Sequence, residues 1–405
     1  MTLFVLGGAQ TDFARNYARE GLDVSDLVAE VVASTLQDAQ VDAEAIQTIH
    51  VGNAFGLLFN NQSQLGAMPA TVEPALWGVP AARHEGACAS GGLAVLAAGA
   101  EIEAGRYDVA LVLGVEQEKN VPGDRAAQIL GAAAWHGHED TEAPYMWPHQ
   151  FNLLAQEYDR RFGLDDRHLA AIAELNYRNA RSNPNAQTRT WSITEFGPDD
   201  ATNPVVDGRI RRTDCSQVTD GGAGLVLAGR RFAEQWAARH GRSLDDVPQI
   251  KGWGHRTVGL SYREKVARSE TSVFVMPHVR HTITDAFDRA SLPDVFALDG
   301  IETHDCFTSS EYLAIDHFGI TQPGESWKAI EAGTLERDGS TPVNPSGGLI
   351  GGGHPVGATG VRMVLDAAKQ VSGKAGDYQV DGARTFGTLN IGGSTTTTVS
   401  FVIGV

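Results

Sequence analysis

The sequence predicts an α/β protein built from two similar halves, and three observations lead to this fold class. Strand-like and helix-like stretches alternate through the N-terminal part of the chain and again from about Pro248 onwards. Several of the strands are nearly continuous apolar runs, which a sheet covered on both faces requires. In each half a reactive residue type lies at a glycine-rich turn, ahead of a helix of small residues and a further strand. Two such units are expected to pack together in layers.

The first elements are predicted by their periodicity. They are a strand at Leu3–Gly7, a helix at Val24–Leu36, a strand at Thr48–Gly52, a helix at Ser90–Gly105 and a strand at Asp108–Gly114. The second of these helices is small and apolar on every side until Glu101. Because a helix that is apolar all round is a buried helix, we expect this one to lie inside a layered fold.

The composition changes over residues 120–204. Tryptophan, histidine, tyrosine and proline cluster at Trp135–His149, and amphipathic stretches follow near Asn152–Phe162 and Asp166–Arg181. A turn with the sequence SNPNAQ, beginning at Ser182, closes them. We interpret this region as an inserted, mostly helical subdomain.

The first half resumes after this insertion, and a second α/β block follows it. The remaining expected elements are a strand at Gly221–Ala228, a strand at Ala297–Glu302, a glycine-rich turn and helix at Ser346–Val371, and strands at Thr385–Asn390 and Thr396–Val402. The predicted domains are therefore an N-terminal half (1–119 and 205–245), the insertion (120–204) and a C-terminal half (246–405).

Charge and cysteine content exclude several classes of protein. The 405 residues include 32 Lys and Arg against 50 Asp and Glu, a net charge of −18, which argues against binding to nucleic acid or anionic membranes. The three cysteines form neither a disulfide framework nor a metal-ligand pattern. The N-terminus lacks a basic signal-peptide start, and the uncharged stretch Gly86–Ala100 is too short to span a bilayer. We expect a cytoplasmic protein without a membrane span.

The sharpest local signal is the motif GACASGG, which places Cys88 just ahead of a predicted helix. A thiol at that position feels the positive end of the helix dipole and unpaired backbone N–H groups, both of which favour the thiolate. The surrounding small residues leave room for a substrate. The alternative is a buried cysteine that packs as a small hydrophobic side chain.

A second signal is SGGLIGGGHPVGATG, in which five glycines precede His354 and Pro355 fixes the backbone before a helix that begins near Gly357. Rigid surroundings with few side chains hold an imidazole in place and leave space beside it. A phosphate-binding loop is the alternative, but the motif lacks the lysine and the spacing of a P-loop. We predict a functional histidine.

A third segment, Glu302–Phe307, contains His304 and Cys306 directly after a predicted strand, where catalytic groups gather in α/β sheets. On its own it fits a buried histidine and cysteine equally well. Together with Cys88 and His354 it supplies a nucleophile, bases and oxyanion donors.

Three further groups of residues are weaker candidates for a functional site. The histidines His136, His138 and His149 lack a further ligand at suitable spacing, so we predict no metal site. Cys215 precedes a strand-like run and is expected in the core. Arg209, Arg211 and Arg212 form a basic spot on an acidic chain; a solvated surface is the default reading, and a phosphate contact is the alternative.

With these residues in hand, the sequence resembles the thiolases, and within them the branch of the sterol-carrier-protein-X thiolase. GACASGG is similar to the family's nucleophile motif, GGGHPVGATG to its Gly-His-Pro motif, and HDCF stands where ordinary thiolases have Asn-Glu-Ala-Phe. Similar spacing at Asn176–Asn179, Asp214–Gly224 and Leu389–Ser394 extends the resemblance over the whole chain. It implies the thiolase fold, in which two α/β halves form a five-layered α-β-α-β-α core with an inserted loop domain.

The resemblance also implies roles for these positions. Cys88 takes the acyl group as a thioester, and His354 is its activating base and helps to bind the other thioester oxygen. His304 stands where ordinary thiolases use Asn for that oxygen. The N–H groups of Cys88 and Gly392 are expected to form the oxyanion hole. A second catalytic cysteine of ordinary thiolases is replaced here by Asn390, so Cys306 is the candidate for α-proton transfer.

The implied reaction is the reversible cleavage of a 3-ketoacyl-CoA by CoA, an acetyl-CoA C-acyltransferase activity of fatty-acid or lipid metabolism. The expected substrate is acyl-CoA, with no permanently bound cofactor. The insertion is expected to cover it, and the arginines 209, 211 and 212 to hold a CoA phosphate. The expected partners are a second copy, as a homodimer or dimer of dimers, and a zinc-ribbon and OB-fold protein.

Four alternatives stay open on the same residues. Three are enzymes of the same fold, namely a retro-aldolase, a decarboxylating ketoacyl synthase and a plain acyltransferase. The fourth is a non-catalytic acyl-CoA or lipid-binding subunit. Retention of Cys88 speaks against the retro-aldolase, whereas the absence of cysteine at Asn390 keeps it open.

Overall fold

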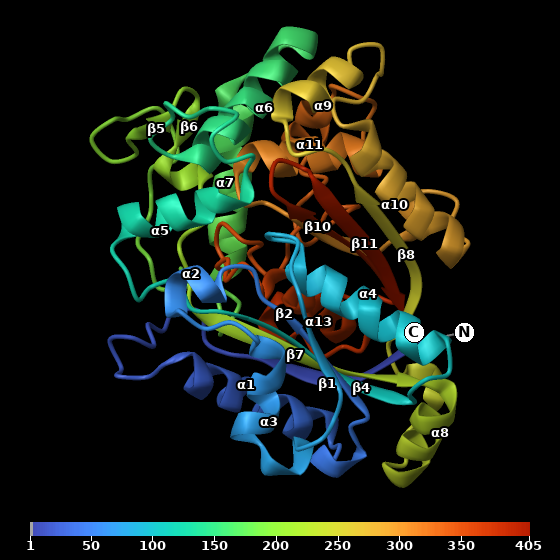
Figure 1. Ribbon diagram of the computed structural model, residues 1–405. Helices are drawn as coiled ribbons and strands as arrows, with labels where there is room; N and C mark the ends of the chain where they lie inside the picture. The colour runs from blue at the N-terminus through green and yellow to red at the C-terminus, as the bar shows by residue number, and fades with distance from the viewer. Residues whose placement is uncertain (1–2) are drawn as a thin grey trace.

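The computed structural model of the chain describes residues 3–405 and shows a nine-stranded sheet layered with helices (Figure 1). The strands are β1 (Leu3–Gln10), β2 (Thr48–Gly52), β3 (Ala81–His84), β4 (Val109–Glu116), β5 (Val205–Asp207), β6 (Ile210–Arg211), β7 (Gly221–Gly229), β8 (Gln249–Thr257), β9 (Gly300–Thr303), β10 (Thr385–Gly392) and β11 (Thr397–Gly404). The order across the sheet is β3-β2-β4-β7-β1-β8-β11-β10-β9, and β5 and β6 form a separate ribbon.

The sheet consists of two half-sheets that correspond to the two halves of the chain. The first five strands of that order come from the N-terminal half and the last four from the C-terminal half. They join where β1 and β8 pair antiparallel, with Leu3 opposite Ile250 and Phe4 opposite Gln249. Strand β2 is parallel to β3 and β4, β9 is parallel to β10, and the other neighbours are antiparallel.

The helices lie on both faces of each half-sheet. They are α1 (Val24–Ala39), α2 (Gly56–Asn60), α3 (Met68–Val72), α4 (Ser90–Glu103), α5 (Gly123–Leu130), α6 (Met146–Phe162), α7 (Asp166–Ala180), α8 (Arg230–Arg239), α9 (Tyr262–Arg268), α10 (Pro277–Ala290), α11 (Thr308–Phe318), α12 (Ser326–Glu331) and α13 (Thr359–Val371). Among residues 3–405, no helix is both long and apolar enough to cross a membrane.

Alternating side chains on β1 reveal the layers. Phe4 and Leu6 pack in one core with residues of α1 and α8, whereas Leu3 and Val5 face α4 and α13 in a second core. A third core packs α10 and α11 against the C-terminal half-sheet. The order is therefore helix, sheet, helix, sheet, helix, with α4 and α13 in the middle (Figure 1). This confirms the expected five-layered α/β fold.

The two central helices, α4 and α13, cross at glycines. A Cβ atom on Gly360 would lie 2.2 Å from the nitrogen of Gly92, and one on Gly91 would lie 2.8 Å from the nitrogen of Val361. The small residues of α4 thus allow its backbone to touch that of α13. Because Cys88 comes just before α4 and His354 comes just before α13, this crossing brings the two motifs together.

Several predicted boundaries differ from the structure by two or more residues. The strand expected at Ala297–Glu302 begins only at Gly300, because the carboxylate of Asp294 accepts the N–H of Phe296 and caps a short 3₁₀ turn over Val295–Ala297. Helix α4 ends at Glu103 rather than Gly105, and α6 begins at Met146, well before Asn152. Residues 120–204 contain α5, α6 and α7, in agreement with the expected helical character of this region.

Candidate active site

Cys88 lies in a tight turn between β3 and α4. Ala87, just before it, has a left-handed backbone with φ of +50°, a conformation that costs a residue with a side chain about 1–3 kcal/mol. The hydroxyl of Ser90 donates to the Ala87 carbonyl at 2.6 Å and accepts the N–H of Gly86 at 3.0 Å, while Glu85 accepts the N–H of Ala87. The turn is therefore held in a strained form that presents the sulfur.

His354 is fixed on the other central motif. Its Nδ1 lies 2.6 Å from the hydroxyl of Thr359, which itself donates to the Pro355 carbonyl at 3.2 Å. Because that hydroxyl proton is committed to the carbonyl, we assign the imidazole proton to Nδ1. Nε2 then carries the lone pair, and within the described residues it is buried without a hydrogen-bond partner. This is the arrangement of a free base.

The glycine-rich segment before His354 wraps around one carboxylate. Asp305 accepts the N–H groups of Leu349 at 2.6 Å and Ile350 at 3.1 Å, and the side-chain amide of Asn176 at 3.0 Å. A Cβ atom on Gly348, whose φ is +60°, would lie 2.3 Å from this carboxylate. The glycines thus let the backbone fold onto Asp305.

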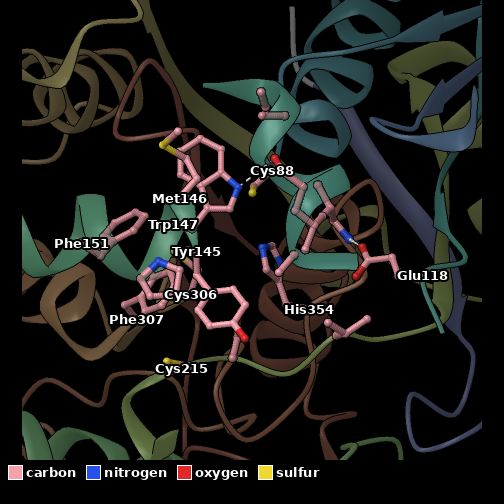
Figure 2. Close-up of a pocket in the computed structure, with 18 of the residues that line it drawn as sticks. Cys88, Glu118, Tyr145, Met146, Trp147, Phe151, Cys215, Cys306, Phe307 and His354 are labelled. Carbon is pink, nitrogen blue, oxygen red and sulfur yellow. Dashed lines mark hydrogen bonds between the residues drawn. The ribbon is translucent and has the colours of Figure 1, made fainter. Parts of the chain in front are cut away.

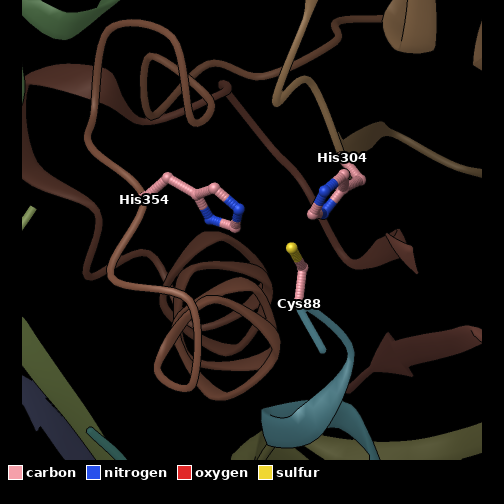
Figure 3. A group of neighbouring side chains, drawn as sticks. All are labelled: Cys88, His304 and His354. Atoms are coloured by element: carbon pink, nitrogen blue, oxygen red, sulfur yellow. The ribbon is translucent and has the colours of Figure 1, made fainter. Parts of the chain in front are cut away.

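His304 completes the central group of side chains (Figure 3). The Cys88 sulfur and a nitrogen from each of His304 and His354 all lie within 4.8 Å of one another. The two imidazoles meet edge to face, with centroids 5.2 Å apart. Asn390 on β10 donates to the Cys88 carbonyl at 2.9 Å and lies 3.4 Å from Nδ1 of His304, so it links the two motifs. Cysteine and histidine side chains, which meet here, also suit a soft metal ion, and the absence of a metal stays an expectation.

Burial keeps this group uncharged. Burial, and then the charge of Glu118, raise the pKa of the Cys88 thiol to about 12, although the N–H groups of Gly393 and Cys88 oppose the shift. Burial and then the positive charge of Arg362 lower the pKa of His354 to about 3, and burial holds the pKa of His304 well below its usual value. The helix N-terminus was expected to favour the thiolate, but in the resting protein burial outweighs it. The pair rests as neutral thiol and neutral imidazole.

This protonation state has a measurable consequence. Because the thiol pKa is raised, the thiolate fraction of Cys88 grows about tenfold for each pH unit below that pKa. We therefore expect the rate of Cys88 alkylation by iodoacetamide to rise steadily between pH 6 and 10. Mass spectrometry of the modified peptide, with Cys88→Ser as the blank, measures that rate. A plateau below pH 8 would instead show a preformed thiolate–imidazolium pair.

The sulfur opens into a cavity of about 150 Å³ (Figure 2). Most of its walls are apolar or aromatic, and they include Phe55, Leu130, Tyr145, Met146, Trp147, Phe151, Phe307 and Val356. The rings of Phe151 and Phe307 stack with centroids 4.7 Å apart. Residues from the 120–204 region form much of this wall, so an apolar group attached to Cys88 would be covered by that region.

All three cysteines of the chain line this cavity. Cys306, expected beside Cys88, is 5% exposed, and its sulfur lies 3.9 Å from the hydroxyl of Ser310. Burial, and then the neighbouring Cys88, raise its pKa well above the usual value. Cys215, expected in the core, is instead half-buried on the cavity wall and donates to the Arg211 carbonyl at 3.3 Å.

Two further residues that line the cavity, Glu118 and Gly393, were not predicted from the sequence. Glu118, two residues after the end of β4, is 1% exposed and accepts the N–H of Val356 at 2.9 Å; burial and then Glu116 raise its pKa well above the usual value. Gly393, which follows the predicted Gly392, lines the cavity together with Cys88, and its N–H lowers the pKa of the Cys88 thiol. An acidic residue just after an apolar strand was the available signal for Glu118.

The arginine cluster lies apart from the residues that line this cavity. The guanidinium of Arg209 pairs with Asp159 at 2.8 Å and Asp166 at 2.6 Å, and that of Arg211 pairs with Asp200 at 2.7 Å. Arg212 is exposed and donates to the Thr202 carbonyl. Phosphate binding by this cluster stays a prediction.

Two of the three histidines considered for a metal site, His138 and His149, have ordinary partners. His149 pairs with Asp207 at 3.2 Å and lies 3.7 Å from Asp140, while the ring of His138 stacks on Trp135. Among the described residues, the group of side chains close enough to hold a metal is the one formed by Cys88, His304 and His354.

Comparison with known proteins identifies the family. The family model for the N-terminal domain of thiolase matches residues 3–194, and the thiolase C-terminal domain-like model matches residues 261–405. The chain is 30% identical over 397 residues to an acetyl-CoA acetyltransferase of Methanothermobacter thermautotrophicus, with 96% of each chain covered. It is 26% identical over 411 residues to human sterol carrier protein 2, covering 98% of this chain and 71% of that one.

Two solved structures have the same fold. One is described as an Ltp2-ChsH2(DUF35) aldolase, with a TM-score of 0.80, 19% identity and coverage of 100% of this chain and 98% of that one. The other is an acetyl-CoA acetyltransferase from Syntrophomonas wolfei, with a TM-score of 0.70, 18% identity and the same coverage. The family models span most of the chain, and the curated relatives match it nearly end to end. The chain therefore belongs to the thiolase family.

Proposed function

We propose that this protein is an acyl-CoA acyltransferase that cleaves a 3-ketoacyl-CoA with CoA, and reverses that reaction, through an acyl thioester on Cys88. The observation that carries the proposal is the meeting of the Cys88 sulfur with the imidazoles of His354 and His304 at the wall of an apolar cavity. A nucleophile beside a free base, next to room for an acyl chain, is what covalent acyl transfer needs.

The first half of the reaction uses the neutral pair. Nε2 of His354 takes the Cys88 proton as the sulfur attacks the 3-keto carbon of the substrate. The bond between carbons 2 and 3 then breaks, which leaves the acyl group on Cys88 and an acetyl-CoA enolate. Cys306, which burial keeps protonated, gives its proton to carbon 2 of that enolate. Acetyl-CoA then leaves.

The second half returns every proton. Cys306, now a thiolate, takes the proton of an incoming CoA thiol, and the CoA sulfur attacks the thioester on Cys88. The Cys88 sulfur leaves and recovers its proton from the imidazolium of His354. The shortened acyl-CoA departs, and the three side chains regain their resting states.

Two sets of donors act on the negative oxygens of these steps. Three N–H groups stabilise the oxygen of the acyl group on Cys88: that of Cys88 itself, that of Gly392 by resemblance, and that of Gly393, which lowers the pKa of the Cys88 thiol. His304 and His354 face the thioester oxygen of the acetyl-CoA enolate. Donors that are already in place where charge develops commonly provide the largest share of catalysis.

A coupled assay with matched substrates tests this function. The protein should consume a 3-ketoacyl-CoA only when free CoA is added and should release acetyl-CoA, without any malonyl donor. A decarboxylating synthase would require malonyl-CoA, and a retro-aldolase would cleave a 3-hydroxyacyl-CoA without free CoA. Binding without turnover in all three assays would favour a lipid-binding subunit.

The proposed CoA-phosphate contact falls on Arg212. The guanidinium groups of Arg209 and Arg211 are paired with carboxylates, whereas Arg212 bonds a neutral carbonyl and is exposed. Because a charged hydrogen bond contributes about 1.5–3 kcal/mol, Arg212→Gln should raise the KM for CoA by about tenfold or more. Arg230→Gln, on exposed helix α8, is the control. An Arg212→Gln variant with the wild-type KM for CoA and the wild-type kcat would reject the contact between Arg212 and a CoA phosphate.

We propose a second copy of the chain as a partner at the β3 edge of the sheet. Ala81 and Ala82 on this edge are exposed, and the neighbouring face of α4 is apolar but incompletely covered at Leu96 and Ala97. An apolar cavity of about 530 Å³ runs beside this face. Sedimentation equilibrium should give the dimer mass for the wild type and a smaller mass for Leu96→Asp.

The control for this interface is Val273→Asp, since Val273 is 65% exposed and lies outside this cavity. A wild-type monomer would contradict the proposed pairing. A zinc-ribbon and OB-fold protein is the second proposed partner; in support, the similar aldolase structure carries a DUF35 protein in its description. Co-elution of the two purified proteins would test it.

A further inference from the structure

The turn between β10 and β11, residues 393–396, carries a conformation that needs external support. Gly393 and Thr395 both have left-handed backbones, with φ of +62° and +65°. The N–H of Thr395 bonds the Gly393 carbonyl at 2.9 Å, and Gly393 lines the same cavity as Cys88, where its N–H lowers the pKa of the Cys88 thiol. A left-handed threonine is strained by about 1–3 kcal/mol, so the surrounding structure must hold this turn in shape.

Lys265 on α9 supplies that support with its full set of donors. Its ammonium donates to the carbonyl of Ser394 at 2.7 Å, to the hydroxyl of Ser394 at 2.9 Å and to the hydroxyl of Thr396 at 2.7 Å. All three acceptors are uncharged, and Lys265 is only 6% exposed. Burying an ammonium on neutral acceptors is costly, and burial lowers its pKa to about 7. If these hydrogen bonds served stability alone, a neutral donor side chain would make them at a lower desolvation cost than a buried ammonium.

One further contact holds the turn itself, and another holds the helix that carries Lys265. Nε2 of His278, on α10, lies 2.8 Å from the carbonyl and 3.1 Å from the hydroxyl of Thr395. The buried carboxylate of Glu139 accepts the hydroxyl of Ser261 at 2.7 Å and the N–H of Tyr262 at 2.9 Å, which fixes the start of α9. Glu139 belongs to the 120–204 region that covers the cavity. The helix that holds the turn is thus itself held by that region.

We propose that Lys265 is a positioning residue that keeps the Gly393 N–H aimed at the Cys88 sulfur and at the oxygen of the acyl group it carries. The expected effect of Lys265 on the rate of acyl transfer rests on the proposed function. The Lys265 amino group acts through the turn, because its three bonds fix Ser394 and Thr396, the first and third residues after Gly393. A donor misplaced by about 1 Å can cost on the order of a hundredfold in rate.

Three variants separate positioning from charge and from stability. Lys265→Met removes the three bonds, and Thr396→Val removes one acceptor while leaving the ammonium in place. Arg268→Met is the control, because Arg268 lies on the same helix, carries the same charge and pairs at the surface with Glu264. Two readouts are compared: the pH profile of Cys88 alkylation by iodoacetamide, which needs no substrate, and kcat against KM for a 3-ketoacyl-CoA.

We expect Lys265→Met to lower the alkylation rate at each pH by about tenfold and to displace the profile to higher pH, because the thiolate loses an N–H donor. Its kcat should fall by about 10- to 100-fold, with KM within about twofold of the wild type. Thr396→Val should change both readouts in the same direction by less, and Arg268→Met should match the wild type.

A folded Lys265→Met with the wild-type alkylation profile would overturn the proposal, even if its kcat were lower. Should that variant fail to fold, a wild-type profile in Thr396→Val overturns it instead. The two proposals also fail separately. If the alkylation profile of Lys265→Met shifts but neither the wild type nor any variant turns over a ketoacyl-CoA, the positioning role is supported and the proposed reaction is rejected.

Discussion

Cys88→Ala should lose CoA-dependent cleavage of a 3-ketoacyl-CoA by about 10⁴-fold or more. Removal of a covalent nucleophile eliminates the thioester route, and what is left comes from binding and oxyanion donors alone. The substitution should fold normally, because Cys88 sits in a turn held by Ser90 and Glu85 rather than by its own side chain. Steady-state rates, together with the thermal midpoint, measure both expectations.

The matched control is Cys215→Ala, which removes a thiol from the wall of the same cavity. It should retain activity within a few-fold of the wild type. Equal losses in the two variants would show that the cavity shape, and not the nucleophile, is what the first substitution disturbs. Substantial cleavage by Cys88→Ala would remove the thioester from the mechanism.

Cys306→Ala should separate carbon–carbon chemistry from acyl transfer. Without an acid to protonate the enolate, cleavage of a 3-ketoacyl-CoA should fall by about 10²- to 10⁴-fold. Transfer of an acyl group from a simple acyl-CoA to Cys88 breaks no carbon–carbon bond, so it should continue within about tenfold of the wild-type rate. Quenched-flow mass spectrometry measures this acylation, and the cleavage assay measures the other step.

Cys306→Ser tests the same role without removing volume. A hydroxyl is a far weaker acid than a thiol, so this variant should resemble Cys306→Ala in cleavage. If acylation and cleavage fall together in both variants, Cys306 shapes the cavity for Cys88 rather than transferring the α-proton. If neither falls, another group moves that proton, and Glu118, the carboxyl residue among those that line the cavity, is the candidate.

Most of the layered fold could be predicted from the sequence because its signals are local. Apolar runs such as Asp108–Gly114 and the small-residue helix after Cys88 correspond to β4 and α4 within a few residues. The glycines of α4 also have a reason that the sequence hides, since they meet Gly360 on α13. The misplaced start of β9 came from Asp294, whose side chain caps a turn where apolar content alone favoured a strand.

The central residues of the site could likewise be predicted from the sequence, whereas the residues that hold them in place could not. Cys88 and His354 stand in distinctive motifs, but Lys265 and Ser394 are 129 residues apart, and Asp305 meets Leu349 across 44 residues. Such contacts have no local pattern. The buried pair of Arg362 with Glu302, at 2.7 Å beneath the site, is of the same kind. The balance between burial and the helix dipole at Cys88 also depends on residues distant in the sequence. The prediction that the helix dipole favours the thiolate was therefore wrong for the resting protein, in which burial raises the thiol pKa.

The most direct test of the acyl-thioester mechanism is the intact mass of the protein after brief incubation with an acyl-CoA, followed by peptide mapping. The mechanism predicts one added acyl group on Cys88 in the wild type and in Cys306→Ala, none in Cys88→Ala, and removal of the group by free CoA. An acyl group on Cys215 or Cys306 in place of Cys88, or no acyl group on a wild type that nevertheless cleaves a ketoacyl-CoA, would contradict it.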